Sequence, residues 1–118
     1  MSKMTNQAEI RFYKIRRLLR KLKIADYYDA SQYLEVAVLM LMKNKSLRIL
    51  QDVYPTVAER FGKNSAVVRG NIEMLIWYMW DTEGREEYFK IFNKRKTLLP
   101  PDDLQFLRML TEYLSREE

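Results

Sequence analysis

Two pairs of adjacent carboxylates, Glu86–Glu87 and Asp102–Asp103, are the side chains in this sequence that best fit acid–base chemistry. Such chemistry needs both carboxylates to face one site, whereas neighbouring residues on a helix point about 100° apart. Helix capping and the attraction between acids and a helix N-terminus account for both pairs more simply. We therefore interpret both pairs as structural.

The chain contains no histidine and no cysteine. Histidine is the commonest general base and metal ligand, and cysteine supplies disulfides and thiolate metal sites. We therefore expect no metal site, no cofactor and no catalytic residue. We predict that the protein is not an enzyme and has no small-molecule substrate.

Basic residues are separated from acidic ones along the chain. The 21 Lys and Arg outnumber the 16 Asp and Glu, for a formal net charge of +5. Cations crowd residues 11–23, and Lys94, Arg95 and Lys96 form a second basic cluster. This distribution suits an anionic partner such as nucleic acid, although it also fits helix faces that are merely solvated.

The elements that must position these side chains are helices, because apolar residues recur at helical spacing and only three glycines and three prolines interrupt them. We predict a single all-α domain, 1–118, of about six or seven helices. The N-terminal ten residues are polar, and no apolar run is long enough for a membrane span. We therefore expect a cytoplasmic protein that does not contact a membrane.

Capping residues and helix breakers divide the chain further. We expect caps at Asn6, at Asp29 or Ser31, at Asn64 or Ser65, and at Asp102 or Asp103. We also expect a break at Tyr54, because the residue before a proline disfavours helical geometry. The expected helices lie near 6–22, 32–43, 46–53, 55–61, 65–80, 85–92 and from 103 onward.

Residues 55–80 are typical of a helix-turn-helix, in which two helices are joined by a turn of three or four residues. Val57, Ala58 and Phe61 can pack inward from the first helix, and Gly62 allows a tight reversal. Val68 and Ile72 face back from the second helix. In such a motif the N-terminal half of the second helix enters the major groove of DNA.

At these positions the chain resembles a known family, the C-terminal DNA-binding effector domains of bacterial sporulation-initiation response regulators of the stage zero sporulation protein A type. The similarity runs from Ile15 to the final helix, with a short deletion near Lys45–Ser46. The matching residues are Tyr33, Leu34, Ala37, Tyr54, Pro55, Val57, Ala58, Phe61, Val68, Ile72, Ile76, Trp80, Phe106, Leu107, Met109 and Leu110. The resemblance implies a transcription regulator that binds double-stranded DNA and serves sporulation, and it is compatible with a homodimer on DNA.

The same comparison gives the expected DNA-binding residues. The positions that correspond to the family's base-reading face are Val67, Arg69, Gly70 and Glu73, and of these only Arg69 suits a bidentate contact to guanine. Around them we expect contacts from Arg60, Lys63, Asn64, Ser65, Lys94, Arg95 and Lys96. A continuous positive face joining these cations would favour DNA, whereas a neutral and apolar face would favour a protein partner.

Two further expectations concern regulation and partners. The residues before Ile15 are too few for the receiver domain that precedes this domain in the family, so we expect no aspartyl phosphorylation within the chain. The reduced base-reading face supports an alternative function, a protein-interaction module that keeps the fold but has lost sequence-specific readout. We expect Trp80 in the core, and Trp77 either exposed or at a dimer contact.

Overall fold

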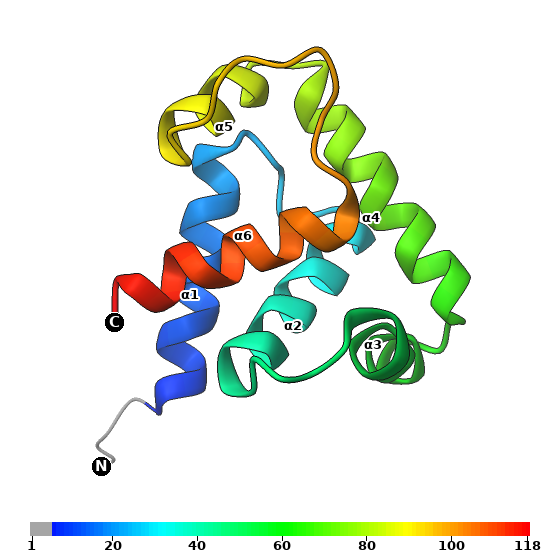
Figure 1. Ribbon diagram of the computed structural model, residues 1–118. Coiled ribbons are helices and arrows are strands. Elements are labelled where there is room, and N and C mark those ends of the chain that lie inside the picture. The colour runs from blue at the N-terminus through cyan, green and yellow to red at the C-terminus, as the bar shows by residue number, and fades with distance from the viewer. Residues whose placement is uncertain (1–5) are drawn as a thin grey trace.

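The computed structural model describes residues 6–118, so the first five residues of the polar N-terminal stretch lie outside it. Over the described residues the chain forms six α-helices and a π-helical turn, with no strand, which confirms the predicted all-α class (Figure 1). In chain order the elements are α1 (Gln7–Lys21), α2 (Asp29–Lys43), η1 (Ile49–Val53), α3 (Tyr54–Phe61), α4 (Ser65–Trp80), α5 (Gly84–Ile91) and α6 (Asp103–Arg116).

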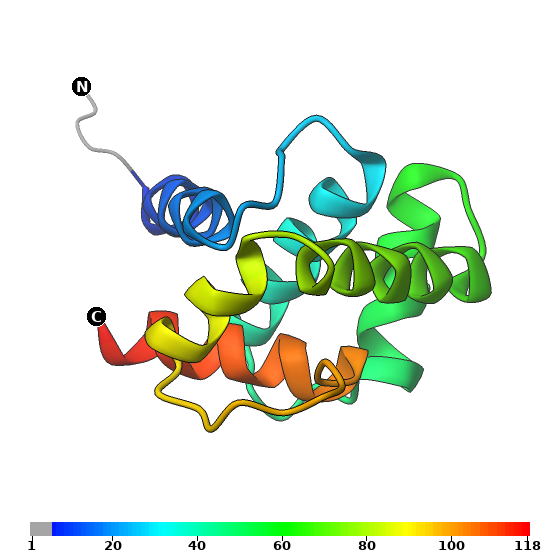
Figure 2. The same ribbon diagram turned by 90° about the horizontal axis from the view of Figure 1, so that it is seen from above.

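Helix α2 lies at the centre of the molecule. Figures 1 and 2 show α1 and α5 on one side of it and α3 and α4 on the other, while α6 crosses it. Its sequence is apolar on nearly every face, and nine of its 15 residues are buried. Even Glu35 is buried, because Arg16 of α1 donates to both of its carboxylate oxygens at 3.0 and 3.2 Å.

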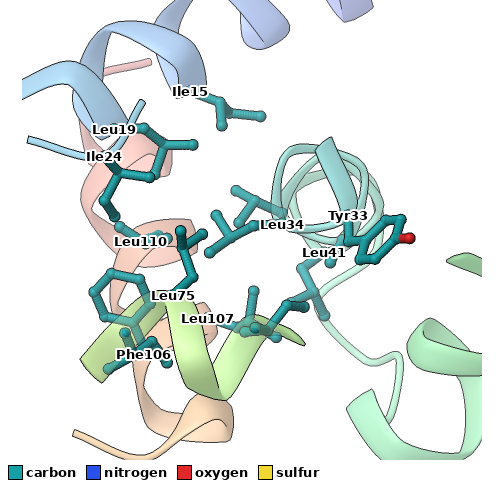
Figure 3. Packing of buried hydrophobic residues seen from close by; sticks show 14 of the residues in the cluster. Ile15, Leu19, Ile24, Tyr33, Leu34, Leu41, Leu75, Phe106, Leu107 and Leu110 are labelled. Carbon is teal, nitrogen blue, oxygen red and sulfur yellow. The ribbon is translucent and has the colours of Figure 1, made fainter. Parts of the chain in front are cut away.

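The hydrophobic core joins four helices. In Figure 3 the side chains of Ile15 and Leu19 from α1, Leu34 from α2, Leu75 from α4 and Leu110 from α6 point into a common space. All five are buried. Burial of such aliphatic side chains contributes roughly 1.5–3 kcal/mol each, so this cluster fixes how the helices are placed.

Three of the expected helix caps are confirmed. Asn6 accepts a hydrogen bond from the Glu9 amide at 2.9 Å, and Asn64 accepts one from the Val67 amide at 2.9 Å. Asp102 accepts one from the Gln105 amide at 2.7 Å. Each bond satisfies a backbone donor that the first turn of a helix leaves free.

The expected cap of α2 is wrong. The helix begins at Asp29, and its N-cap is Tyr28, which makes no side-chain capping bond. Ser31 lies inside the first turn, where its hydroxyl donates to the Ala25 carbonyl and stabilises the preceding loop. Ser31 therefore does not cap the helix, because its hydroxyl is used in the hydrogen bond to Ala25, six residues earlier in the chain.

The expected helix 46–53 and the break at Tyr54 are also wrong. The helical turn is η1, a π-helix, and Tyr54 has φ −60° and ψ −43°, so the backbone passes from η1 into α3 without an extended residue. The Tyr54 amide donates to the Ile49 carbonyl across the wide turn, and Pro55 lies in the first turn of α3, where its missing N–H costs no helical bond. Arg48 secures the start of η1, because its amide donates to Asp52 Oδ2 at 2.8 Å.

Among the residues that the structure describes, no helix is both long and apolar enough to cross a membrane.

Helix α5 differs from its expected range by one residue at each end. Gly84 at its start packs against the end of α1, since a Cβ there would lie 2.3 Å from the Leu22 carbonyl oxygen. The absence of a side chain at Gly84 therefore permits α5 to fold back beside α1.

Candidate nucleic-acid interface

The α3–α4 unit has the geometry of a helix-turn-helix. Gly62 ends α3 in the left-handed conformation (φ 67°, ψ 36°), and the Lys63 amide donates to the Ala58 carbonyl at 2.8 Å. Glycine adopts this conformation without steric cost, so the chain reverses tightly and Asn64 starts α4. The predicted tight turn is confirmed.

The inward faces of the two helices are packed as the sequence predicted. Val57, Ala58, Val68 and Ile72 are buried. Phe61 is half-buried, and its ring lies edge-on to that of Tyr33 in α2, with 5.0 Å between the centroids. This packing holds α3 and α4 as a rigid unit against the centre of the molecule.

The start of α4 presents a small polar surface. Arg60, Lys63 and Asn64 are exposed, and Ser65 is half-buried. The Asn64 Oδ1 is already engaged as the helix cap. The structure thus brings four of the expected residues together at the α3–α4 turn, where the helix N-terminus adds a partial positive charge.

Arg69, the residue expected to read bases, contacts a carboxylate of its own chain. Its Nη2 donates to Asp103 Oδ1 at 3.4 Å, and its Nε lies 3.0 Å from Asp103 Oδ2. The second contact is an ion pair, because the Nε–H is not aligned for a hydrogen bond with any described residue. Glu73 Oε2 lies 3.9 Å from the same nitrogen. Two carboxylates therefore offset the charge of the single expected base-reading arginine.

Asp103 is the residue of this region that the sequence did not identify. Of the two expected caps of α6, Asp102 takes that role, and Asp103 is buried. The Tyr54 hydroxyl donates to Asp103 Oδ2 at 2.6 Å. Burial and then this carboxylate raise the pKa of Tyr54, and the charge of Asp103 raises the pKa of Arg69.

The basic cluster at residues 94–96 lies away from the α3–α4 turn. Lys96 Nζ is 3.5 Å from Glu86 Oε1 of α5, and the Lys94 amide donates to the Phe89 carbonyl at 3.0 Å. Figures 1 and 2 show α5 on the side of α1, away from the turn, and the segment that follows α5 starts there before it crosses to α4 and the start of α6. Lys94, Arg95 and Lys96 therefore do not join Arg60, Lys63 and Arg69 in one continuous positive face.

The exposed surface of α4 includes an apolar strip. We name Val67, Gly70, Met74 and Trp77 the α4 stripe, because they recur at spacings of three and four residues along one side of the helix. Val67 is 40% exposed, Met74 71% and Trp77 48%. Tyr78 beside them is also exposed, whereas Trp80 is buried in the core as predicted. Trp77 was expected to be either exposed or at a dimer contact, and the structure places it at the surface of the single chain, where both remain open.

The described residues contain no cluster of three or more histidine, cysteine, aspartate or glutamate side chains that could hold a metal ion.

Comparison with known families gives a match over residues 15–114 to the model described as "Sporulation initiation factor Spo0A C terminal". No curated protein matches the chain. The match includes every element from the middle of α1 to the last turn of α6.

Proposed function

Because this chain belongs to the family of sporulation initiation factor Spo0A C-terminal domains, we propose that it docks α4 in the major groove of double-stranded DNA and so regulates transcription. The family is one of DNA-binding regulatory domains and not of enzymes. The observation that carries the proposal is the α3–turn–α4 unit, with its left-handed Gly62 and its exposed α4 N-terminus.

In the proposed complex the first turn of α4 contacts DNA. Lys63 and Asn64 precede the helix and are exposed, so they can reach phosphates or base edges. Arg60 at the end of α3 contacts the phosphate backbone, as the first helix of the motif crosses it. The positive end of the α4 dipole favours phosphate at the same place.

Arg69 has a different role in this proposal from that of a free arginine. Asp103 fixes its guanidinium, so little side-chain freedom is lost when Arg69 contacts a base. Asp103 and Glu73 also reduce its net attraction for phosphate. We therefore propose that Arg69 reads base edges, whereas Arg60 and Lys63 raise the affinity for DNA through phosphates. Lys94–Lys96 lie outside the contact with the groove in this proposal.

Fluorescence anisotropy with a random duplex library tests the proposal. Binding at about 50 mM salt should weaken by orders of magnitude at about 200 mM, because neutralised phosphates release counterions. The double variant Arg60→Ala/Lys63→Ala should lose most of the binding. Arg17→Ala/Lys21→Ala is the matched control, since it removes the same charge from exposed positions on α1. Absence of binding at the lower salt contradicts the proposal.

The α4 stripe supports a second candidate, an interaction module that binds a protein instead of DNA. Its exposed apolar side chains make the surface around Arg69 nearly neutral. A neutral and apolar surface favours a protein partner over DNA. Under this candidate Trp77→Ala abolishes recovery of the partner in a pull-down, while Arg69→Ala has no effect. The opposite result contradicts the second candidate.

A further inference from the structure

We propose that the α4 stripe binds a second copy of this chain, with the two α4 helices packed antiparallel about a two-fold axis. Figure 1 shows α4 along the edge of the molecule, so its outer side is accessible to a partner. The stripe is uncharged over its whole length, from Val67 to Trp77. Its spacing of three, four and three residues is that of the contact seam between two packed helices.

The side chains of the stripe are graded in size. The N-terminal half carries the small residues Val67 and Gly70, and the C-terminal half carries the large residues Met74 and Trp77. In an antiparallel pair, Gly70 lies opposite Met74 of the second copy, and Val67 lies opposite Trp77 of the second copy. Each large side chain thus meets a small one, in two layers that the two-fold axis repeats.

Gly70 has no evident purpose within the single chain. A Cβ at this position would meet no atom within 4 Å among the described residues, and the backbone there is helical. Glycine nevertheless costs a helix roughly 1 kcal/mol relative to alanine. Space for Met74 of a second copy accounts for the glycine, because close approach of another helix requires a small side chain at the crossing.

The charges beside the stripe complement each other in the same arrangement. Lys63 precedes α4 and Asp81 follows it, and both are exposed. The antiparallel pairing places Lys63 of each copy near Asp81 of the other, whereas a parallel pairing would place like charges together. Arg69 on the flank lies 3.0 Å from Asp103 and 3.9 Å from Glu73 of its own chain, so its positive charge is already offset.

The dimer should be weak and dependent on concentration. A stable interface buries about 800 Å² on each partner, which is more than four side chains supply. Trp77 and Leu99 line one shallow groove beside the stripe, so the contact can extend over the exposed residues before α6. We therefore expect dimerisation in the micromolar range or above and not an obligate dimer.

Dimerisation has a consequence that rests on the proposed function. The interface covers Val67 and Gly70, which lie in the half of α4 that would enter the groove. The dimer and the DNA complex therefore exclude each other, and DNA binding per chain should fall as the protein concentration rises.

Sedimentation velocity from low micromolar to near-millimolar concentration tests the dimer. The unmodified chain should shift from monomer to dimer, and acrylamide quenching of Trp77 should fall at the same concentrations. Gly70→Gln should stay monomeric although it folds, because the side chain enters open space in the monomer but fills the position of Met74 in the dimer. Met74→Glu should also stay monomeric. Tyr13→Glu is the control, since Tyr13 is 61% exposed and lies on α1, outside the stripe and the groove beside it.

A second experiment tests the orientation. The chain has no cysteine, so single cysteines can be introduced without interference. When Gly70→Cys chains are mixed with Met74→Cys chains and oxidised, the antiparallel arrangement predicts disulfides mainly between the two kinds of chain. Disulfides mainly within each kind would overturn the antiparallel arrangement. A wild-type chain that stays monomeric at every concentration, or a Gly70→Gln chain that dimerises equally well, would overturn the dimer itself.

These outcomes are separate from those of the DNA experiment. Anisotropy is measured with labelled DNA and protein at concentrations where the chain is monomeric. Absence of DNA binding with an intact dimer contradicts the proposed function and the competition but leaves the dimer. DNA binding by a chain that never dimerises contradicts the dimer but leaves the proposed function.

Discussion

The hydroxyl of Tyr54 donates a hydrogen bond to Asp103 Oδ2 at 2.6 Å, across 49 residues of sequence. Tyr54 begins α3 and Asp103 begins α6, and both are buried. Arg69 of α4 lies 3.0 Å from the same carboxylate oxygen. One buried carboxylate therefore fixes both helices of the helix-turn-helix relative to the last helix of the fold.

The first prediction concerns the strength of this contact. Tyr54→Phe should lower the free energy of unfolding by about 1.5–3 kcal/mol, the usual value for a hydrogen bond to a charged group. Asp103→Ala should cost at least as much, because it leaves a buried hydroxyl without its acceptor. The double variant should lose less than the sum, since both changes break one interaction. Urea denaturation measures all three, with Tyr13→Phe as an exposed control that should change nothing.

The second prediction is a loss of stability in base. Burial and the neighbouring Asp103 raise the pKa of Tyr54 above its ordinary value of 10.0. Above pH 10 the unfolded chain releases this proton while the folded chain keeps it, so stability falls as the pH rises. Below pH 10 the contribution is fully present.

Urea denaturation between about pH 9 and pH 11 measures this effect, since tyrosine ordinarily titrates near pH 10. Tyr54→Phe should decline less steeply than the unmodified chain. Burial also raises the pKa of Tyr88, so some decline should remain in the variant. Equal slopes for the two proteins would contradict the assignment to Tyr54.

The third prediction contrasts two glycines. Gly62 is left-handed, so Gly62→Ala should destabilise the protein by about 1–2 kcal/mol. Gly70 is helical and faces open space, so Gly70→Ala should stabilise the monomer by up to about 1 kcal/mol. Thermal unfolding at low protein concentration compares the two variants, because dimerisation at high concentration would add to the apparent stability of the folded chain. A stabilised Gly62→Ala protein would refute the left-handed turn.

The fourth prediction separates affinity from readout on DNA. Lys63→Ala should weaken binding to all sequences alike and reduce the slope of log affinity against log salt by about one. Arg69→Ala should change the slope little, because Asp103 and Glu73 already offset its charge. It should instead relax sequence preference, as measured by selection from a random library. A large change of slope for Arg69→Ala would show that its charge is free.

Local signals in the sequence predicted much of the scaffold. The caps at Asn6, Asn64 and Asp102 depend on residues three positions away, and the turn at Gly62 depends on one residue type. The buried face of α4 follows from its apolar spacing. Such features need no knowledge of distant contacts, which is why a single sequence reveals them.

The electrostatics of the candidate interface could not be predicted in the same way. Arg69 is held by Asp103, 34 residues later in the chain, and nothing near either residue indicates their approach. The cluster at residues 94–96 was expected beside the α3–α4 turn, but the return of α5 toward α1 takes it to the other side. The break at Tyr54 failed because η1 provides a wide turn that accommodates the proline.

The π-helical turn at Ile49–Val53 also makes the entrance to the helix-turn-helix tolerant of the loss of one residue. A π turn contains about one residue more than an α turn. Leu50 and Gln51 are exposed, so deletion of either removes no core side chain. The turn can then close to ordinary α-helix while Tyr54 still faces Asp103. A deletion of one residue at this point is thus absorbed before it reaches the helices that follow.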